Sequence, residues 1–404
     1  MKARKTGGRL RIAAWLMGAA LLCLTAACAA GEKSITLTFA GDCTLGSTEE
    51  RRGQEDSFDA VAQREGYDYF FKNYVDIFEK DDLTMVNLEG VFQDHAANEY
   101  KGKTFRFRGQ TDYVRILKDA SIELCGLGNN HSGDYGATGL KNTKETLEGA
   151  GIHWCHVNDY YLFEKDGIRI AFFSLAWADH LQNYDKVRTT IQELKESGEA
   201  NAVVLMFHSG TEYDPHRNSN KQEKAEQMYI NAGADLILMS HAHVVQGIHI
   251  MNHRTTFYCL GNFVFGGNHQ VKTKAYKDRV ATPLYTLVVQ AKLYFSDDGT
   301  YKGQQMTLIP GFVTSTTEFN RNNMQVNNYQ PIRLSIEEAE CVLEAIQYDT
   351  PWFEIPKAQM DGRGYAIVKL NYEPATDEDR ETGAAGDGPE AAPPKPYRDI
   401  KEIP

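Results

Sequence analysis

The sequence predicts the α/β fold class, with one layered domain over residues 31–268 and a smaller β-rich region after it. Apolar segments of strand length alternate with amphipathic segments of helix length throughout this range. Polar residues of ligand type follow directly on the apolar segments, and α/β proteins bind ligands at the carboxyl ends of their strands. With 404 residues the chain can bury a large core in one domain or two.

The first half of the domain opens with a strand, because residues 34–40 alternate in polarity and are rich in β-branched side chains. This segment runs into a glycine-flanked turn that contains Asp42. Later strands are recognised as short apolar runs, and helices by apolar residues three and four positions apart. The expected elements are strand 34–40, helix 67–79, strand 83–88, strand 105–108, helix 112–119, strand 122–126 and helix 138–150.

The second half repeats the alternation of strands and helices. The run 202–207 is apolar throughout, as expected for a strand that is buried on both faces. The expected elements are strand 168–175, helix 190–197, strand 202–207, helix 221–232, strand 236–239 and strand 256–260.

Residues 269–373 have a different pattern and are expected to form a C-terminal extension packed on the main domain. Residues 283–295 and 305–313 flank a Ser-Asp-Asp-Gly turn and predict a β-hairpin. Ser335 and Glu338 form a capping box that opens a helix to about residue 347, and residues 364–370 predict a last strand. Residues 374–404 are rich in Pro, Gly, Ala and acidic residues and are expected to be a disordered tail.

Residues 1–30 are expected to be an export leader. Five basic residues precede the apolar segment from Ile12 to Ala30, which is the order of a secretory signal. Leu24-Thr-Ala-Ala-Cys28 resembles a lipobox, in which the cysteine is lipidated and becomes the mature N-terminus. Three outcomes stay open: lipidation at Cys28, retention as an N-terminal membrane anchor, or cleavage and secretion. All three place the remainder at the extracytoplasmic face of the cell membrane.

Composition excludes several classes of protein. The formal net charge of −12 argues against a nucleic-acid partner and is compatible with divalent cations. The cysteines outside the leader are scattered and form no CxxC pair, which argues against a structural zinc knot and a disulfide scaffold.

The stretch after strand 236–239 carries two imidazoles, at His241 and His243. In extended backbone two residues at i and i+2 point the same way, so both rings are expected to converge on one point. Taken alone, the pair is compatible with two solvated loop histidines. However, residues of ligand type end five apolar strands in all, and such a set suits a pair of borderline metals such as Mn, Fe or Zn. The members of the set are Asp42, Glu89, Asn130, His208, His241 and His243.

These motifs resemble those of the bacterial CapA-type proteins of poly-γ-glutamate capsule synthesis. The matching motifs are Gly41-Asp42, Asn87-Leu-Glu89, Asn129-Asn130-His131 with Asp134, His208-Ser-Gly-Thr-Glu212-Tyr, His241-Ala-His243 and Gly261-Asn-Phe-Val-Phe. That family belongs to the calcineurin-like metallophosphatase superfamily. The resemblance implies a four-layer α/β/β/α sandwich with a dinuclear metal centre between its two sheets.

The resemblance also implies a role for each matching residue. Asp42 would bind the first metal, Glu89 would bridge the two, Asn130 and His208 would bind the second, and His241 and His243 would be shared between them. His131 would act as a general acid or transition-state donor, oriented by Asp134. A hydrogen-bonded loop pair is the alternative for these last two residues.

The first motif departs from the superfamily pattern. Metallophosphatases carry Asp-x-His there, whereas Thr44 stands two residues after Asp42. Either Glu212 or water fills the gap, or one of the two metal sites is weak or empty. Asn262 is expected to shape the pocket rather than to bind metal.

The sequence therefore supports a membrane-anchored protein with a metallophosphatase-like domain, acting in the synthesis, export or attachment of an anionic envelope polymer. Its expected partners are that polymer or a phosphoester substrate, the membrane, and a membrane-bound synthase complex. Two alternatives stay open: a non-catalytic subunit that binds or assembles the polymer, and an exported phosphoesterase or nucleotidase.

Overall fold

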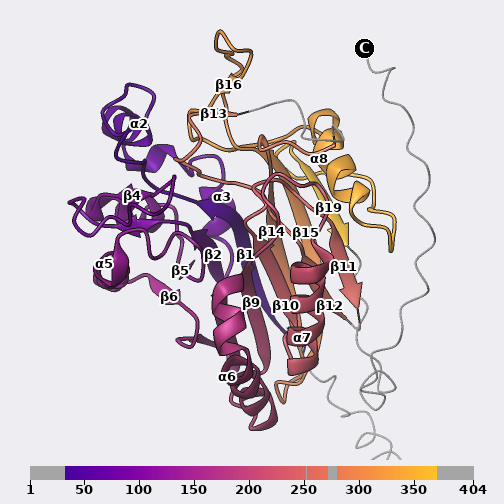
Figure 1. Ribbon diagram of the computed structural model, residues 1–404. Helices are drawn as coiled ribbons and strands as arrows, with labels where there is room; N and C mark the ends of the chain where they lie inside the picture. The colour runs from indigo at the N-terminus through magenta and orange to yellow at the C-terminus, as the bar shows by residue number, and fades with distance from the viewer. Residues whose placement is uncertain (1–31, 252, 272–279, 371–404) are drawn as a thin grey trace, which may run out of the picture.

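The computed structural model describes residues 32–251, 253–271 and 280–370 (Figure 1). The expected leader with Cys28 and the expected tail at 374–404 lie outside the described residues.

A nine-stranded sheet forms one half of the molecule. Four of its strands, β1, β2, β5 and β6, are mutually parallel neighbours. On the other side of β1, strands β14, β15, β19 and β18 follow in antiparallel pairs, and β17 pairs with β15. The bounds are β1 Lys33–Cys43, β2 Leu83–Leu88, β5 Leu124–Gly126, β6 His153–Cys155, β14 Tyr285–Phe295, β15 Tyr301–Phe312, β17 Ile332–Arg333, β18 Gln359–Met360 and β19 Ala366–Leu370.

A six-stranded sheet forms the other half. Strands β8, β9, β10 and β12 run parallel to one another, and β7 and β11 close the two edges in antiparallel pairs. The bounds are β7 Tyr161–Lys165, β8 Ile168–Ala176, β9 Ala202–His208, β10 Leu236–Ser240, β11 Ile248–Met251 and β12 Arg254–Phe257. Two small ladders lie outside these sheets, and they pair β3 Val91–Phe92 with β4 Arg108–Gly109 and β13 Gln270–Val271 with β16 Gln325–Val326.

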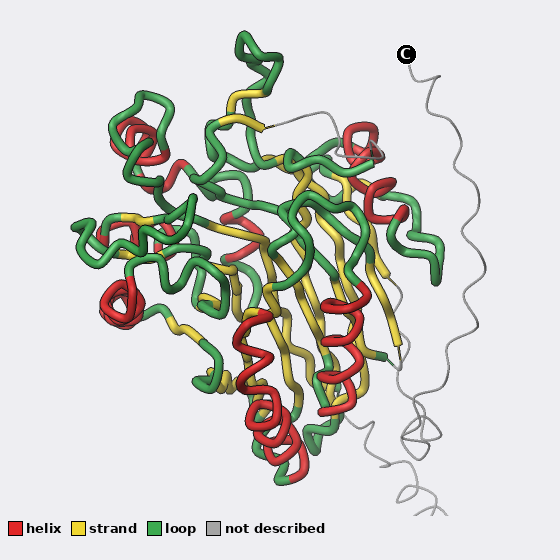
Figure 2. Tube along the Cα trace, in the orientation of Figure 1, coloured by secondary structure: helices red, strands yellow, loops and turns green. Residues whose placement is uncertain are grey.

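The two sheets pack face to face and helices pack on their outer faces. Figure 2 shows helices lying over the near face of the strands. Side chains alternate between the two faces of a strand. Met85 of β2 and Val204 of β9 therefore lie in the core between the sheets. Val86 of β2 instead packs against the helices on its own side, and Val203 of β9 does the same on the other. The α/β class is confirmed, and the layers follow the expected order of helix, sheet, sheet and helix.

Helices α2, α3, α4 and α5 contribute to the outer core of the first sheet, and α6 and α7 to that of the second. Helix α8 packs on β15 and β19 and contributes to the core between the sheets. The helices are α2 Phe58–Glu65, α3 Val75–Phe78, α4 Val114–Lys118, α5 Gly136–Ala150, α6 Trp177–Glu196, α7 Lys224–Ala232 and α8 Ile336–Tyr348; short helical turns lie at Tyr67–Tyr69, Thr111–Tyr113 and Ser219–Glu223.

Several expected elements differ in the structure. The helix expected at 67–79 is only a 3₁₀ turn and the four-residue α3, because its aromatic residues Phe70, Phe71 and Tyr74 turn into the outer core of the first sheet. The strand expected at 105–108 is reduced to β4. The helix expected at 190–197 is longer and begins at Trp177, where the Asp179 side chain accepts a hydrogen bond from the backbone N–H of Ala176. Helix α2 and strands β6, β7 and β11 were not expected.

The hairpin expected at 283–313 is present as β14 and β15. Strand β14 pairs with β1 over seven residue pairs from Lys33–Phe295 to Phe39–Val289, so the hairpin continues the first sheet. The Ser335–Glu338 capping box opens α8 as expected. Within the described residues, none of the helices has the length and hydrophobicity needed to cross a bilayer.

Candidate metal centre

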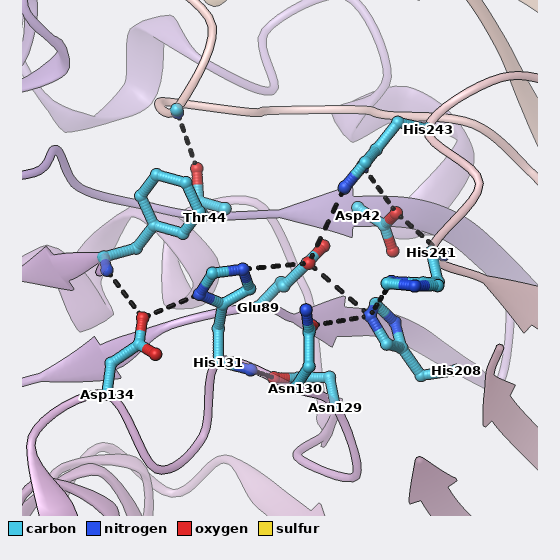
Figure 3. Close-up of polar contacts among 12 residues, drawn as sticks. Asp42, Thr44, Glu89, Asn129, Asn130, His131, Asp134, His208, His241 and His243 are labelled. Atoms are coloured by element: carbon cyan, nitrogen blue, oxygen red, sulfur yellow. Dashed lines mark hydrogen bonds and ion pairs between the residues drawn. The ribbon is translucent and has the colours of Figure 1, made fainter. Parts of the chain in front are cut away.

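The carboxyl ends of the parallel strands of both sheets meet at one place (Figure 3). Asp42 is the penultimate residue of β1, Glu89 follows β2, and Asn130 lies four residues after β5. From the second sheet, His208 ends β9 and His241 follows β10. Residues that are far apart in the chain are thus brought together by the ends of their strands.

The close approach of two chain segments fixes the position of Asp42. The backbone N–H of Asp42 donates to the carbonyl of Gly261, at 3.1 Å, and the carbonyl of Asp42 accepts from the N–H of Phe263, at 2.9 Å. A Cβ atom on Gly41 would lie 2.0 Å from the carbonyl oxygen of Gly261. Only glycine therefore allows the end of β1 to pass this close to the loop after β12.

His241 and His243 are not in extended backbone. Their φ angles are 94° and 57°, in the left-handed region, which non-glycine residues rarely adopt. The extended backbone that was expected for this pair is therefore wrong. The ring centroids are 6.1 Å apart, yet one nitrogen of each imidazole lies within 4.8 Å of the other and of a carboxylate oxygen of Glu212. Each imidazole also joins one of two further groups of side chains.

The first group surrounds the Nε2 atom of His208. Asn130 Oδ1 lies 2.8 Å from it, His241 Nδ1 3.1 Å and Glu89 Oε1 3.5 Å. Two ligands of one ion, each about 2.1 Å from it, are separated by about 3.0–3.4 Å in octahedral to tetrahedral geometry. These three distances from His208 Nε2 are thus close to those between two ligands of a single ion.

The second group consists of Asp42, Glu89 and His243, which have ligand atoms within 4.8 Å of one another. Asp42 Oδ2 is 3.4 Å from His243 Nδ1, and Glu89 Oε1 is 4.0 Å from His243 Nε2. Asn262 Oδ1 lies 2.8 Å from His243 Nδ1 and can accept its proton, which leaves Nε2 free as a ligand. Asn262 therefore orients an imidazole, in keeping with the expectation that it shapes the pocket.

Glu89 belongs to both groups and has an unusual environment. Its side chain is fully buried, and neither carboxylate oxygen has a hydrogen-bond partner. Burial, followed by the nearby Asp42 carboxylate, raises the pKa of Glu89 well above its ordinary value. A buried carboxylate without hydrogen bonds is unfavourable unless a cation compensates it. The environment of Glu89 is thus the one expected of a carboxylate that binds metal ions in both groups.

The pKa shifts of the imidazoles differ between the two groups. His208 and His241 of the first group are neutral, and His243 of the second group is a cation. Burial lowers the pKa of His208 well below its ordinary value, and it lowers the pKa of His241 to about 4. Burial acts in the same direction on His243, but the Glu89 and Asp42 carboxylates outweigh it and raise the pKa of His243 to about 9. A proton on His243 therefore offsets the buried carboxylates in the absence of metal, and an ion bound there would replace it.

Asn87 contacts one member of each group, Asp42 and His208. No role was predicted for this residue from the sequence. Its Nδ2 atom donates to Asp42 Oδ1 at 2.7 Å and lies 3.2 Å from His208 Nδ1. Ser240 Oγ lies 2.8 Å from the same His208 nitrogen. Asn87 lies in β2 and Glu89 directly follows the strand, two residues later, so the alternation of β2 is the signal that could have placed both side chains on one face.

His131 lies beside Glu89, with 3.8 Å between His131 Nε2 and Glu89 Oε1. Its Nδ1 atom is 2.7 Å from Asp134 Oδ2, and Asp134 also pairs with Lys103 Nζ at 2.5 Å. Burial lowers the pKa of His131 below its ordinary value, although Asp134 opposes this shift. Lys103, which was not singled out in the sequence, adds a partly exposed cation at the rim of the centre.

The remaining two expected positions behave differently from each other. Thr44 Oγ1 accepts a hydrogen bond from the N–H of Gly267 at 3.0 Å. Glu212 is exposed, yet one of its oxygens lies within 4.8 Å of nitrogens of both His241 and His243.

Comparison with known sequences identifies relatives of this chain. Residues 36–267 match the family model of the bacterial capsule synthesis protein PGA_cap. The capsule biosynthesis protein CapA of Bacillus anthracis is 29% identical over 257 residues, which cover 58% of this chain and 60% of that protein. The PGA biosynthesis protein CapA of Bacillus subtilis (strain 168) is 28% identical over 252 residues, which cover 57% and 63%. The match therefore spans less than two thirds of the length of either relative.

Solved structures show a weak likeness. The calcineurin-like phosphoesterase YfkN from Bacillus subtilis has a TM-score of 0.39 and 14% identity, covering 69% of this chain and 91% of that chain. A hypothetical protein from Thermus thermophilus also has a TM-score of 0.39 and 14% identity, with 68% and 99% covered.

Proposed function

The chain belongs to the PGA_cap family of bacterial capsule synthesis proteins, whose model matches more than half of its length, and from that premise we propose a metal-dependent hydrolase of the cell envelope. In this proposal it acts in the synthesis, export or attachment of an anionic capsule polymer such as poly-γ-glutamate. The names of its relatives, which are capsule and PGA biosynthesis proteins, support the polymer class. The reaction is the hydrolysis of a phosphoester or a related centre.

One observation carries the metal-dependent part of the proposal. Glu89 is buried, has no hydrogen bond to either oxygen, and is surrounded by His131, His208 and His243 at 3.5–4.0 Å. Imidazole, carboxylate and amide ligands together suit Mn, Fe or Zn. We assign Asn130, His208, His241 and Glu89 to one divalent ion, and Asp42, Glu89 and His243 to another.

When bound, a pair of ions would supply charge neutralisation for the reacting centre and activation of water. The residues of the chain supply the rest of the site. Asp134 accepts a hydrogen bond from His131 Nδ1 and so holds the ring with Nε2 toward the centre. Because burial keeps His131 neutral at neutral pH, Nε2 is available to accept a proton and then to return it to a leaving group.

Metal analysis combined with an ester assay tests this proposal. We expect the purified chain to contain divalent metal and to hydrolyse a chromogenic phosphodiester. The variant His241→Ala should lose both, whereas His131→Ala should keep the metal and lose turnover by about 10²–10⁴-fold, the usual contribution of a general acid–base. Metal without turnover on any ester would refute the hydrolase.

Thr44 favours a second candidate function, a non-catalytic subunit that uses metal to bind polymer carboxylates. The superfamily imidazole is absent at this position, and the hydroxyl of Thr44 is bound to the backbone at Gly267. Metal-dependent binding of polyglutamate, without cleavage of esters, would identify this role.

The proposed location is the extracytoplasmic face of the cell membrane, supported by the basic and apolar order of residues 2–30 and the lipobox-like end at Cys28. The variant Cys28→Ser should abolish metabolic labelling with a lipid precursor. Labelling that persists in this variant would exclude lipidation at Cys28.

A further inference from the structure

We propose that Glu212 is a ligand of the ion held by Asp42, Glu89 and His243, and that it takes the place of the imidazole that Thr44 does not supply. This inference rests on the metal centre proposed above. It adds a carboxylate from the loop after β9, a part of the chain that provides none of the other ligands of that ion.

Thr44 forms two hydrogen bonds with the backbone of residues 264–267. Its N–H donates to the carbonyl of Val264 at 3.1 Å, and its hydroxyl accepts from the N–H of Gly267 at 3.0 Å. The side chain is 2% exposed. Both of its polar groups tie residues 264–267 to the end of β1, so Thr44 serves the shape of the centre instead of ligand binding.

The two proposed ions consequently have unequal ligand sets. The ion beside His208 has four side-chain ligands, from Asn130, His208, His241 and Glu89. The ion beside Asp42 has three, one of which is the shared Glu89. Structural zinc sites take four protein ligands, and catalytic ones take three and keep a place for water. The Asp42 side thus has one side-chain ligand fewer than the His208 side.

Glu212 lies beside His243, a ligand of the ion on the Asp42 side, and beside His241, a ligand of the other ion. One of its carboxylate oxygens and one nitrogen each of His241 and His243 lie within 4.8 Å of one another. The backbone beside it is held in position, because the N–H of Tyr213 donates to the carbonyl of Ala242, between the two histidines, at 2.7 Å. The Tyr213 ring lies 5.8 Å from the His243 ring. The loop that carries Glu212 is therefore attached to the loop that carries both imidazoles.

The balance of charge is compatible with the assignment. Without Glu212, two divalent ions would face the carboxylates of Asp42 and Glu89 alone. A third carboxylate, at the exposed side of the centre, brings the ligand charge closer to that of the ions and leaves one positive charge for an anionic substrate or hydroxide. The exposure of Glu212 places this ligand on the side from which substrate would enter.

Titration of the whole 404-residue chain in detergent with Mn²⁺, followed by calorimetry and by metal content, tests the assignment. We expect two ions in the wild type. In Glu212→Gln one of the two dissociation constants should rise at least about 10-fold, since even residues that only orient a ligand contribute about 10–100-fold. Glu212→His should restore the lost affinity, because it supplies an imidazole. In a His208→Ala background the remaining ion should be the one that Glu212→Gln weakens.

A control variant separates ligation from general effects of charge. Glu199→Gln removes another exposed charge, after α6, and should leave both dissociation constants unchanged. Equal constants in Glu212→Gln and the wild type would overturn the inference while leaving the metal centre intact. A wild type that binds a single ion would likewise overturn it, and one that binds none would refute the metal centre itself.

Discussion

Replacement of Glu89 by Gln should make the protein more stable than the wild type without metal and less stable than the wild type with metal. Without metal, a fully buried carboxylate with no hydrogen bond lies beside Asp42, so its charge opposes folding. Because a glutamine has the same shape and no charge, we expect the metal-free variant to be more stable than the wild type by about 1–3 kcal/mol at pH 8. For a chain of this size this corresponds to roughly 1–2 °C in melting temperature per kcal/mol.

With metal the order should invert. An ion at about 1,000 times its dissociation constant stabilises the wild type by about 4.1 kcal/mol, which exceeds the metal-free difference. The variant lacks the ligand shared by both groups and should gain little from the same concentration of Mn²⁺. Thermal unfolding of both proteins, in chelator and in Mn²⁺, measures all four values.

Glu226→Gln is the matched control, because Glu226 is also buried but has partners. It accepts hydrogen bonds from Tyr258 Oη and, at 2.9 Å, from His249 Nδ1. This variant should lose stability with and without metal and keep the full response to Mn²⁺. The reasoning about Glu89 is refuted if Glu89→Gln is less stable than the wild type in chelator, or if Mn²⁺ raises its melting temperature as much as that of the wild type.

Three further predictions concern other parts of the molecule. Asn262→Ala frees the ring of His243 and should weaken metal binding by about 10–100-fold in a calorimetric titration, with the melting temperature in chelator changed far less. Gly128→Ala places a Cβ 2.3 Å from the backbone of Ser174 and should destabilise the fold by about 1–3 kcal/mol in denaturant unfolding; an unchanged midpoint would contradict the packing. Burial raises the pKa of Asp81 to about 7, so the folded state keeps a proton that the unfolded state releases from about pH 4 upward, and stability falls between about pH 4 and 7. Asp81→Asn should remove this loss and be roughly 1–2 kcal/mol more stable than the wild type at pH 8, but not at pH 4; parallel pH profiles of melting temperature would disprove it.

Strands were predicted better than helices from this sequence. Buried parallel strands such as 202–207 and 236–239 are continuous apolar runs, so their pattern is visible locally. The segment 67–79 has apolar residues at helical spacing, but it forms turns and one short helix. Gly66, which precedes it, has a φ of 87°, and the aromatic side chains of the segment pack into the outer core of the first sheet. These tertiary contacts override the helix propensity of the segment.

The candidate ligands at the strand ends were predicted for the same local reason, and their grouping was not predicted. The amino-acid sequence by itself determined which side chains stand at the ends of strands, because polarity and alternation depend only on near neighbours. Only the tertiary structure decided that His241 joins His208 while His243 joins Asp42, since that division depends on left-handed backbone at both histidines and on how two sheets meet. The lack of hydrogen bonds to the carboxylate oxygens of Glu89 was also decided by the tertiary structure. It depends on which groups pack around the side chain, and these come from distant parts of the chain.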